Sequence, residues 1–128
     1  MQQAGLNHKT KLKLLVISSL LIVLSSLPFA FPHILGGHGI YFAIHVASVS
    51  LGSFLSLVGF FTYKEFKTAK LFLVMCAFLA ITIGETFSFI NNMVTPLIPS
   101  SFGLDALISH GLILLTLSFF VLGIFRSN

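Results

Sequence analysis

Four long apolar segments make up most of this sequence, at approximately residues 12–31, 40–63, 69–90 and 104–125. A helix needs about 20 apolar residues to cross the hydrocarbon core of a bilayer, which is roughly 30 Å thick. All four segments reach that length, and the connections between them contain the Gly, Pro, Asn and Ser typical of helix breaks. The sequence therefore predicts four transmembrane helices.

The composition argues against a water-soluble domain. Hydrophobic residues are 56% of the 128 residues and charged residues only 8%, which is too few to form a solvated surface. The connections are short, so consecutive helices should be antiparallel neighbours. No internal repeat or second domain is visible. We predict an all-α integral membrane protein, an antiparallel up-down bundle of four transmembrane helices that forms a single domain over residues 1–128.

All the basic residues fall on one side of this arrangement. They precede the first segment, separate the second from the third, and follow the fourth: Lys9, Lys11, Lys13, Lys64, Lys67, Lys70 and Arg126. Short loops rich in Lys and Arg are retained in the cytoplasm. We expect a multi-pass protein of the cell membrane with both termini cytoplasmic and with the lipid bilayer as its surroundings.

A cleaved signal peptide is an alternative reading of the first segment. Residues 9–13 resemble its basic region and residues 14–27 its apolar region, with a possible cleavage after Ala30. Pro28, however, occupies a position where that cleavage motif favours a small residue. We therefore favour retention of the segment; cleavage would leave three spans.

Three ionisable residues lie inside the apolar segments, where such groups are costly unless they are paired or face a cavity. His45 lies five residues past Ile40, Glu85 six before Asn91, and His110 five past Asp105. At about 1.5 Å per residue, all three lie roughly 8 to 9 Å inside the non-cytoplasmic boundary. The sequence predicts one polar layer to which three helices contribute.

Small residues place His45 on a packing face. His38, His45, Gly52 and Gly59 follow at seven-residue spacing, and small side chains let a neighbouring helix approach closely. Asp105 begins the fourth helix, where a carboxylate favours the positive end of the helix dipole. We interpret it first as a helix-start residue.

The polar layer has a structural and a ligand-binding interpretation. In the first, Glu85 hydrogen-bonds one or both histidines and ties the helices together. In the second, His45, Glu85 and His110 are metal ligands, with His38 or Asp105 as a further partner; such a set suits zinc, copper or ferrous iron. No contiguous motif such as HExxH or CxxC supports the metal site.

Two other interpretations are open. A b-type haem held by His45 and His110 fits their shared depth, but no basic residue on that side is available for the propionates. Ion or proton translocation has less support, because the cytoplasmic half of the segments offers only Ser, Thr and Gly as polar groups.

No feature of the sequence indicates an enzyme. A GxSxG nucleophile motif, a Gly-rich phosphate loop and a basic groove for nucleic acid are all missing. We expect a non-catalytic accessory or structural subunit of a larger membrane complex, whose partners are other membrane subunits or further copies of the chain. A membrane redox protein that binds a metal ion or haem b is the alternative.

Overall fold

The computed structural model describes residues 7–95 and 104–125, without the side chains of residues 104–106. Four long helices and one π-helical turn follow each other in this part of the chain: α1 (His8–Leu35), α2 (Gly39–Phe66), α3 (Ala69–Phe89), η1 (Ile90–Val94) and α4 (Leu104–Phe125). Each of the four regions is long and apolar enough to cross a membrane. The prediction of four apolar helices is confirmed.

The first helix differs from its predicted boundaries. The prediction ended it at Phe31, whereas α1 continues through Pro28 and Pro32 to Leu35. A proline inside a helix removes one backbone hydrogen bond, and the helix tolerates this loss twice here. The chain turns only at Gly37, whose φ of 78° suits glycine. The helix therefore extends about one turn beyond the approximate end of the predicted span.

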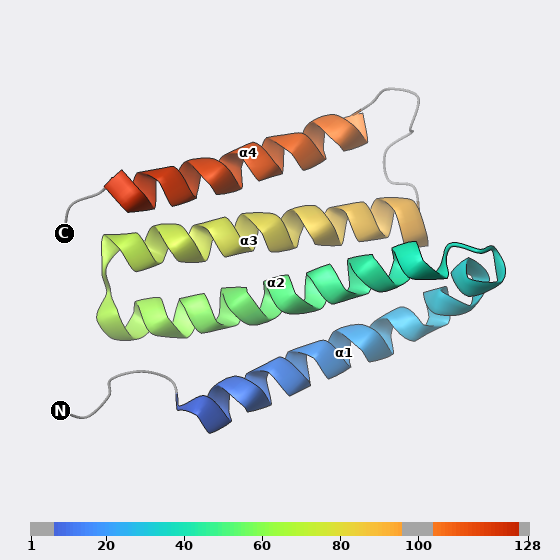
Figure 1. The fold of residues 1–128 in the computed structure, drawn as a ribbon, viewed down its shortest axis with the longest axis horizontal. Helices are drawn as coiled ribbons and strands as arrows, with labels where there is room; N and C mark the ends of the chain where they lie inside the picture. The colour runs from blue at the N-terminus through green and yellow to red at the C-terminus, as the bar shows by residue number, and fades with distance from the viewer. Residues whose placement is uncertain (1–6, 96–103, 126–128) are drawn as a thin grey trace.

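The helices are antiparallel and lie in a row, in the order α4, α3, α2, α1 (Figure 1). Among the described residues, the extensive contacts join helices that are consecutive in the chain, and α1 makes a smaller contact with η1. The up-down order matches the prediction, but the row is open, with α1 and α4 at opposite flanks. Both broad faces of α3 and α2 are therefore less covered than in a closed bundle.

The two ends of the bundle along the helix axes differ in charge. At one of these ends α1 begins, α2 connects to α3, and α4 ends (Figure 1). Six lysines belong to these segments, and we call this the lysine end: Lys9, Lys11, Lys13, Lys64, Lys67 and Lys70. The opposite, histidine end holds the α1–α2 turn with His33 and His38. Arg126 lies outside the described residues.

α2 and α3 pack closely because small residues of α2 face α3. Gly52 is buried, and a Cβ atom added to it would lie 2.7 Å from Thr82 Oγ1. A Cβ atom at Gly59 would lie 3.4 Å from the Cα of Met75. The predicted packing face of α2 is thus confirmed at these two glycines, and it positions the residues around His45 against α3.

Candidate functional site

His45 of α2 and Glu85 of α3 form the one imidazole–carboxylate contact found among the described residues. His45 Nδ1 lies 3.3 Å from Glu85 Oε2. The His45 side chain is 10% exposed and that of Glu85 is 37% exposed. The pair thus joins a buried imidazole to a glutamate side chain that is partly exposed in the isolated chain, and two of the three predicted layer residues are in contact.

One aromatic ring contacts the imidazole directly, and a second aromatic pair packs nearby between α2 and α3. Tyr41, one helical turn before His45, meets it edge-on, with ring centroids 4.6 Å apart and planes at 88°. Phe42, on the next face of α2, packs against Phe89 of α3 with centroids 5.6 Å apart. The role of Tyr41 was missed in the sequence, although its four-residue spacing from His45 places both on one helical face.

The second ring nitrogen of His45 is unsatisfied. Nε2 is buried and has no hydrogen-bond partner within the described part of the chain. A neutral imidazole carries its hydrogen on one nitrogen only. If Nδ1–H donates to Glu85, the lone pair of Nε2 points into the interior without a donor. Leaving a buried polar atom unpaired costs about 1–3 kcal/mol, and a water or ligand that reached this nitrogen would relieve that cost.

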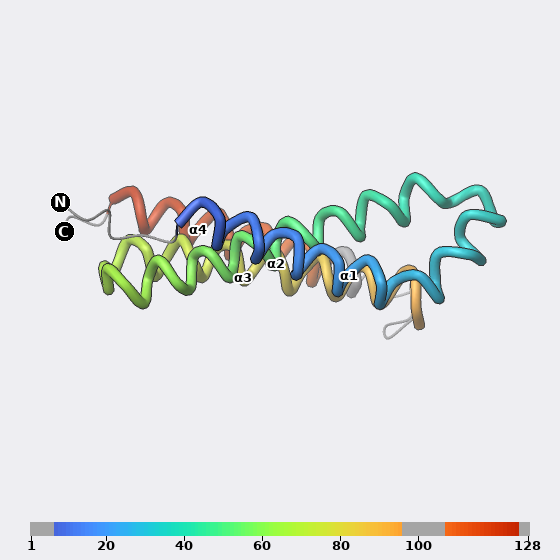
Figure 2. The backbone as a smooth tube through the Cα atoms, turned by 90° about the horizontal axis from the view of Figure 1, so that it is seen from below, coloured from blue at the N-terminus to red at the C-terminus, as the bar shows by residue number. Residues whose placement is uncertain are grey.

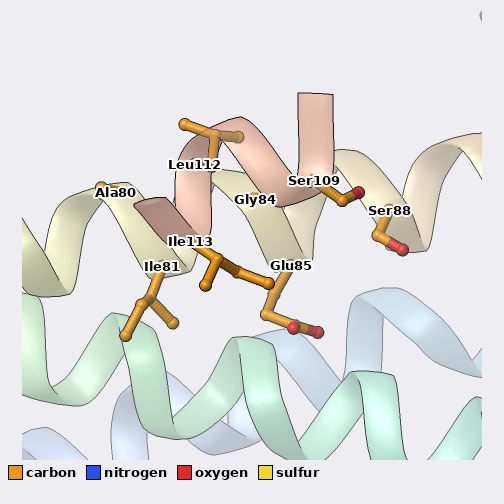
Figure 3. A pocket seen from close by; sticks show the side chains of 8 residues that line it. All are labelled: Ala80, Ile81, Gly84, Glu85, Ser88, Ser109, Leu112 and Ile113. Atoms are coloured by element: carbon orange, nitrogen blue, oxygen red, sulfur yellow. The ribbon is translucent and has the colours of Figure 1, made fainter. Parts of the chain in front are cut away.

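A small cavity lies on the other side of Glu85, between α3 and α4 (Figure 3). Its volume is about 110 Å³, which is room for several water molecules. Glu85, Ser88 and Ser109 supply its polar groups, and the rest of the wall is apolar: Ala80, Ile81, Gly84, Leu112 and Ile113. In Figure 3 the Glu85 carboxylate extends away from α4 toward α2. The carboxylate therefore lies between His45 and a cavity that can hydrate it.

A hydroxyl pair joins α2 to α3 on the lysine-end side of this site. Ser56 Oγ and Thr82 Oγ1 are 3.0 Å apart. Each hydroxyl also donates to its own helix, to the carbonyls of Gly52 and Phe78 respectively, both at 2.8 Å. The two hydroxyl groups have one hydrogen each, but three hydrogen-bond contacts are within reach. The bond between the helices therefore forms only when one hydroxyl stops donating to the carbonyl of its own helix. The pair therefore links the helices weakly.

His110 is not buried with the pair. It is exposed on α4, where Leu112 packs on Gly84 and Thr116 Oγ1 lies 3.4 Å from the carbonyl of Ala77. His110 precedes Leu112 by two residues, about 200° around the helix, which turns it away from the α3–α4 contact. Among the described residues, no three His, Cys, Asp or Glu side chains gather as a metal site.

The two remaining predicted site residues are His38 and Asp105, and neither is seen beside the His45–Glu85 pair. His38 precedes α2 as its exposed N-cap residue and makes no side-chain cap hydrogen bond. The side chain of Asp105 lies outside the described residues, so its predicted roles as helix-start residue and as metal partner stay predictions. Within the described part of one chain, the predicted layer is reduced to His45 and Glu85.

The site around His45 and Glu85 combines three chemical features. It offers a hydrogen-bonded imidazole–carboxylate pair, one unpartnered imidazole nitrogen and a mostly apolar cavity with three polar lining residues, all within the apolar span of the helices. The functional reading depends on this geometry, because in comparisons with protein-family models, curated proteins and solved structures the chain matches none.

Proposed function

We propose that this chain is a multi-pass protein of the cell membrane that works as a non-catalytic subunit of a larger membrane assembly. The single observation that supports it is the exposure of Glu85, whose side chain is 37% exposed within an apolar span. The lysine end faces the cytoplasm in this proposal, because lysines near the ends of short loops are retained there.

A partly exposed glutamate inside a bilayer needs polar partners for its carboxylate. Placing an ionisable group in hydrocarbon costs several kcal/mol, on the order of 3 for an aspartate at the helix centre. His45 engages one carboxylate oxygen, but the open row of helices leaves the outer surface of Glu85 to whatever surrounds the chain. Exposed Leu, Ile and Phe side chains are satisfied by lipid. Glu85 is not, and a protein partner meets its requirement.

Within this proposal the His45–Glu85 pair has two tasks. It joins α2 to α3 through a charge-assisted hydrogen bond, which is stronger in a low dielectric. It also restricts the orientation of the carboxylate, because Tyr41 and the α2–α3 contact restrict the imidazole that holds it. A partner helix would then meet a preoriented acceptor.

A metal or haem site is the second candidate, favoured by the unpartnered Nε2 of His45. Histidines that bind metals usually hydrogen-bond a carboxylate or carbonyl through their other ring nitrogen, and Glu85 occupies that place here. Zinc, copper, ferrous iron or haem iron would suit Nε2. Further ligands would have to come from a partner or a second copy, since three described ligands do not gather in one chain.

Ion or proton movement has less support. The described polar contacts between α2 and α3 run from Glu85 toward the lysine end only as far as the Ser56–Thr82 pair. We rank this function third.

The test compares two alanine variants of the same helix. The tagged chain is extracted in a mild detergent, and the mass of the protein in the particle is measured for wild type, Glu85→Ala and Ser88→Ala. We expect wild type and Ser88→Ala to exceed the 14.0 kDa of one chain, and Glu85→Ala to lose mass. Single chains in all three samples would contradict the proposal. Near-stoichiometric zinc, copper or iron in the wild-type particle would favour the second candidate.

A further inference from the structure

The two helices that line this cavity carry a carboxylate, on Glu85 of α3, and an imidazole, on His110 of α4. Ile81 and Glu85 of α3 and Ile113 of α4 line the same cavity. His110 precedes Ile113 by three residues, so the two share one face of α4, and both are exposed. We call the surface formed by Ile81, Glu85, Ile113 and His110 the Glu85 face.

The two ionisable groups of this face lie at nearly one depth. Glu85 and Ser109 line a common small cavity (Figure 3), and His110 is the residue next to Ser109. One residue along a helix changes the depth by about 1.5 Å. The imidazole and the carboxylate are therefore within about one helical turn of each other along the helix axes, although His110 points away from the α3–α4 contact.

We propose that the partner of this chain is a second copy of itself, docked through the Glu85 face about a two-fold axis along the membrane normal. Glu85 of each copy then meets His110 of the other. This inference rests on the proposed function, and it names the partner that the assembly contains.

Symmetry makes this face suitable for self-association. A two-fold interface places the same surface of both copies against itself, so it must be self-complementary. Copies inserted with the same orientation meet only at equal depth. A face that carries an acceptor and a potential donor at one depth satisfies both conditions. His45 occupies Oε2 of Glu85, which leaves Oε1 for the second imidazole.

Apolar residues extend the complementarity between the two copies by one helical turn toward the lysine end. Ile81 lies four residues before Glu85 on α3, and Ile113 three residues after His110 on α4. Because the two helices are antiparallel, both isoleucines are displaced in the same direction along the membrane normal (Figure 1). They are 38% and 57% exposed. In the dimer, Ile81 of each copy packs against Ile113 of the other.

Cysteine cross-linking in membranes tests the proposed contact. In a Cys76→Ala background, which removes the chain's own cysteine, two differently tagged chains are co-expressed, one with Ile81→Cys and the other with Ile113→Cys. Separate chains are needed because both positions line one cavity and could pair within a single chain. Mild oxidation of the membranes should give a disulfide-linked dimer that carries both tags.

The matched control moves one cysteine to the opposite face. Ile83 is exposed like Ile81 but lies two residues further, about 200° around α3. Chains with Ile83→Cys and Ile113→Cys should cross-link several-fold less. Adding Glu85→Gln to the Ile81→Cys chain should also lower the yield several-fold, while Ser118→Ala, at an exposed serine outside this cavity, should leave it unchanged.

Each other outcome has a defined meaning. Equal cross-linking of the Ile81 and Ile83 variants would overturn the inference, because random collision would explain it. If the specific cross-link is missing although the particle still exceeds one chain in mass, the partner is a different protein or a copy docked through another face; the inference fails and the proposed function stands. A missing cross-link together with single-chain particles would reject both.

Discussion

The two interfaces of α2 are built differently. Toward α3, Gly52 lets the backbones approach, and side chains bond across the contact: His45 to Glu85 and Ser56 to Thr82. Toward α1, the two helices separate as they near the turn that joins them (Figure 2). An apolar groove of about 610 Å³ lies between them, and another of about 390 Å³ lies between α1, α2 and the α3–η1 segment.

The hydrogen bonds of the serines also differ between the two interfaces. Ser18, Ser25 and Ser26 of α1 bond to carbonyls of their own helix three residues earlier, and among the described residues none bonds to α2. The comparison teaches that a polar side chain ties two helices together only where small residues have already brought the helices close. Elsewhere the hydroxyl satisfies itself locally.

The largest expected effect breaks the close interface. Gly52→Leu places a side chain where even a Cβ atom would lie 2.7 Å from Thr82 Oγ1. We expect α2 and α3 to separate, with a loss of about 3 kcal/mol in the free energy of unfolding, at the upper end of the range for overpacked contacts. Thermal unfolding in detergent measures it. Gly111→Leu is the control, because a Cβ atom there meets nothing within 4 Å; equal losses would refute the close contact.

Removing the carboxylate should have the next largest effect. Glu85→Ala removes the partner of His45 Nδ1, so that neither nitrogen of this buried ring has a hydrogen-bond partner among the described residues. The expected cost is about 1–3 kcal/mol. Ser88→Ala, one turn away on the same helix, removes no contact between helices among the described residues. The thermal midpoint of Glu85→Ala should therefore be lower than that of Ser88→Ala. Equal midpoints would contradict a stabilising pair.

Two serine substitutions sharpen the comparison between the interfaces. Ser56→Ala removes a contact across the α2–α3 interface, whereas Ser26→Ala removes only a bond within α1. Interhelical bonds of this kind average about 0.6 kcal/mol in a membrane protein, so Ser56→Ala should cost about that much more. Denaturant titration in mixed micelles measures the difference. A greater cost for Ser26→Ala would reverse our ranking of the two interfaces.

The smallest effect is expected in the groove between α1 and α2. Ala47 is exposed and lines the larger groove, so Ala47→Leu meets open space. The free energy of unfolding should change by less than about 0.5 kcal/mol, as for surface substitutions in general. Chemical denaturation of the variant beside Gly52→Leu checks this. A large loss would show that α1 and α2 pack more closely than the grooves indicate.

The sequence predicted what depends on position along a helix. Length and hydropathy identified the four helices, and counting residues from the helix ends matched the depths of His45 and Glu85, which are in contact. Rotation about the helix axis was not accessible. His110 shares the depth but faces outward, because the contacts of Leu112 and Thr116 with α3 set the rotation of α4.

Two local features also escaped prediction for physical reasons. Proline is a strong break signal, yet α1 continues through Pro28 and Pro32 because two lost hydrogen bonds do not outweigh a long apolar helix. The π-helical turn η1 at Ile90–Val94 has no composition signal that distinguishes it from a helix end. The open row of helices likewise depends on which faces pack, and hydropathy alone does not encode that choice.

The measurement that tests the central claim most directly is the number of protein chains per particle, determined by native mass spectrometry of the wild-type chain released from membranes. Our account predicts at least two chains in each particle, because the partly exposed Glu85 side chain needs a protein partner within the bilayer. A uniform population of particles with one chain and no other protein would contradict it.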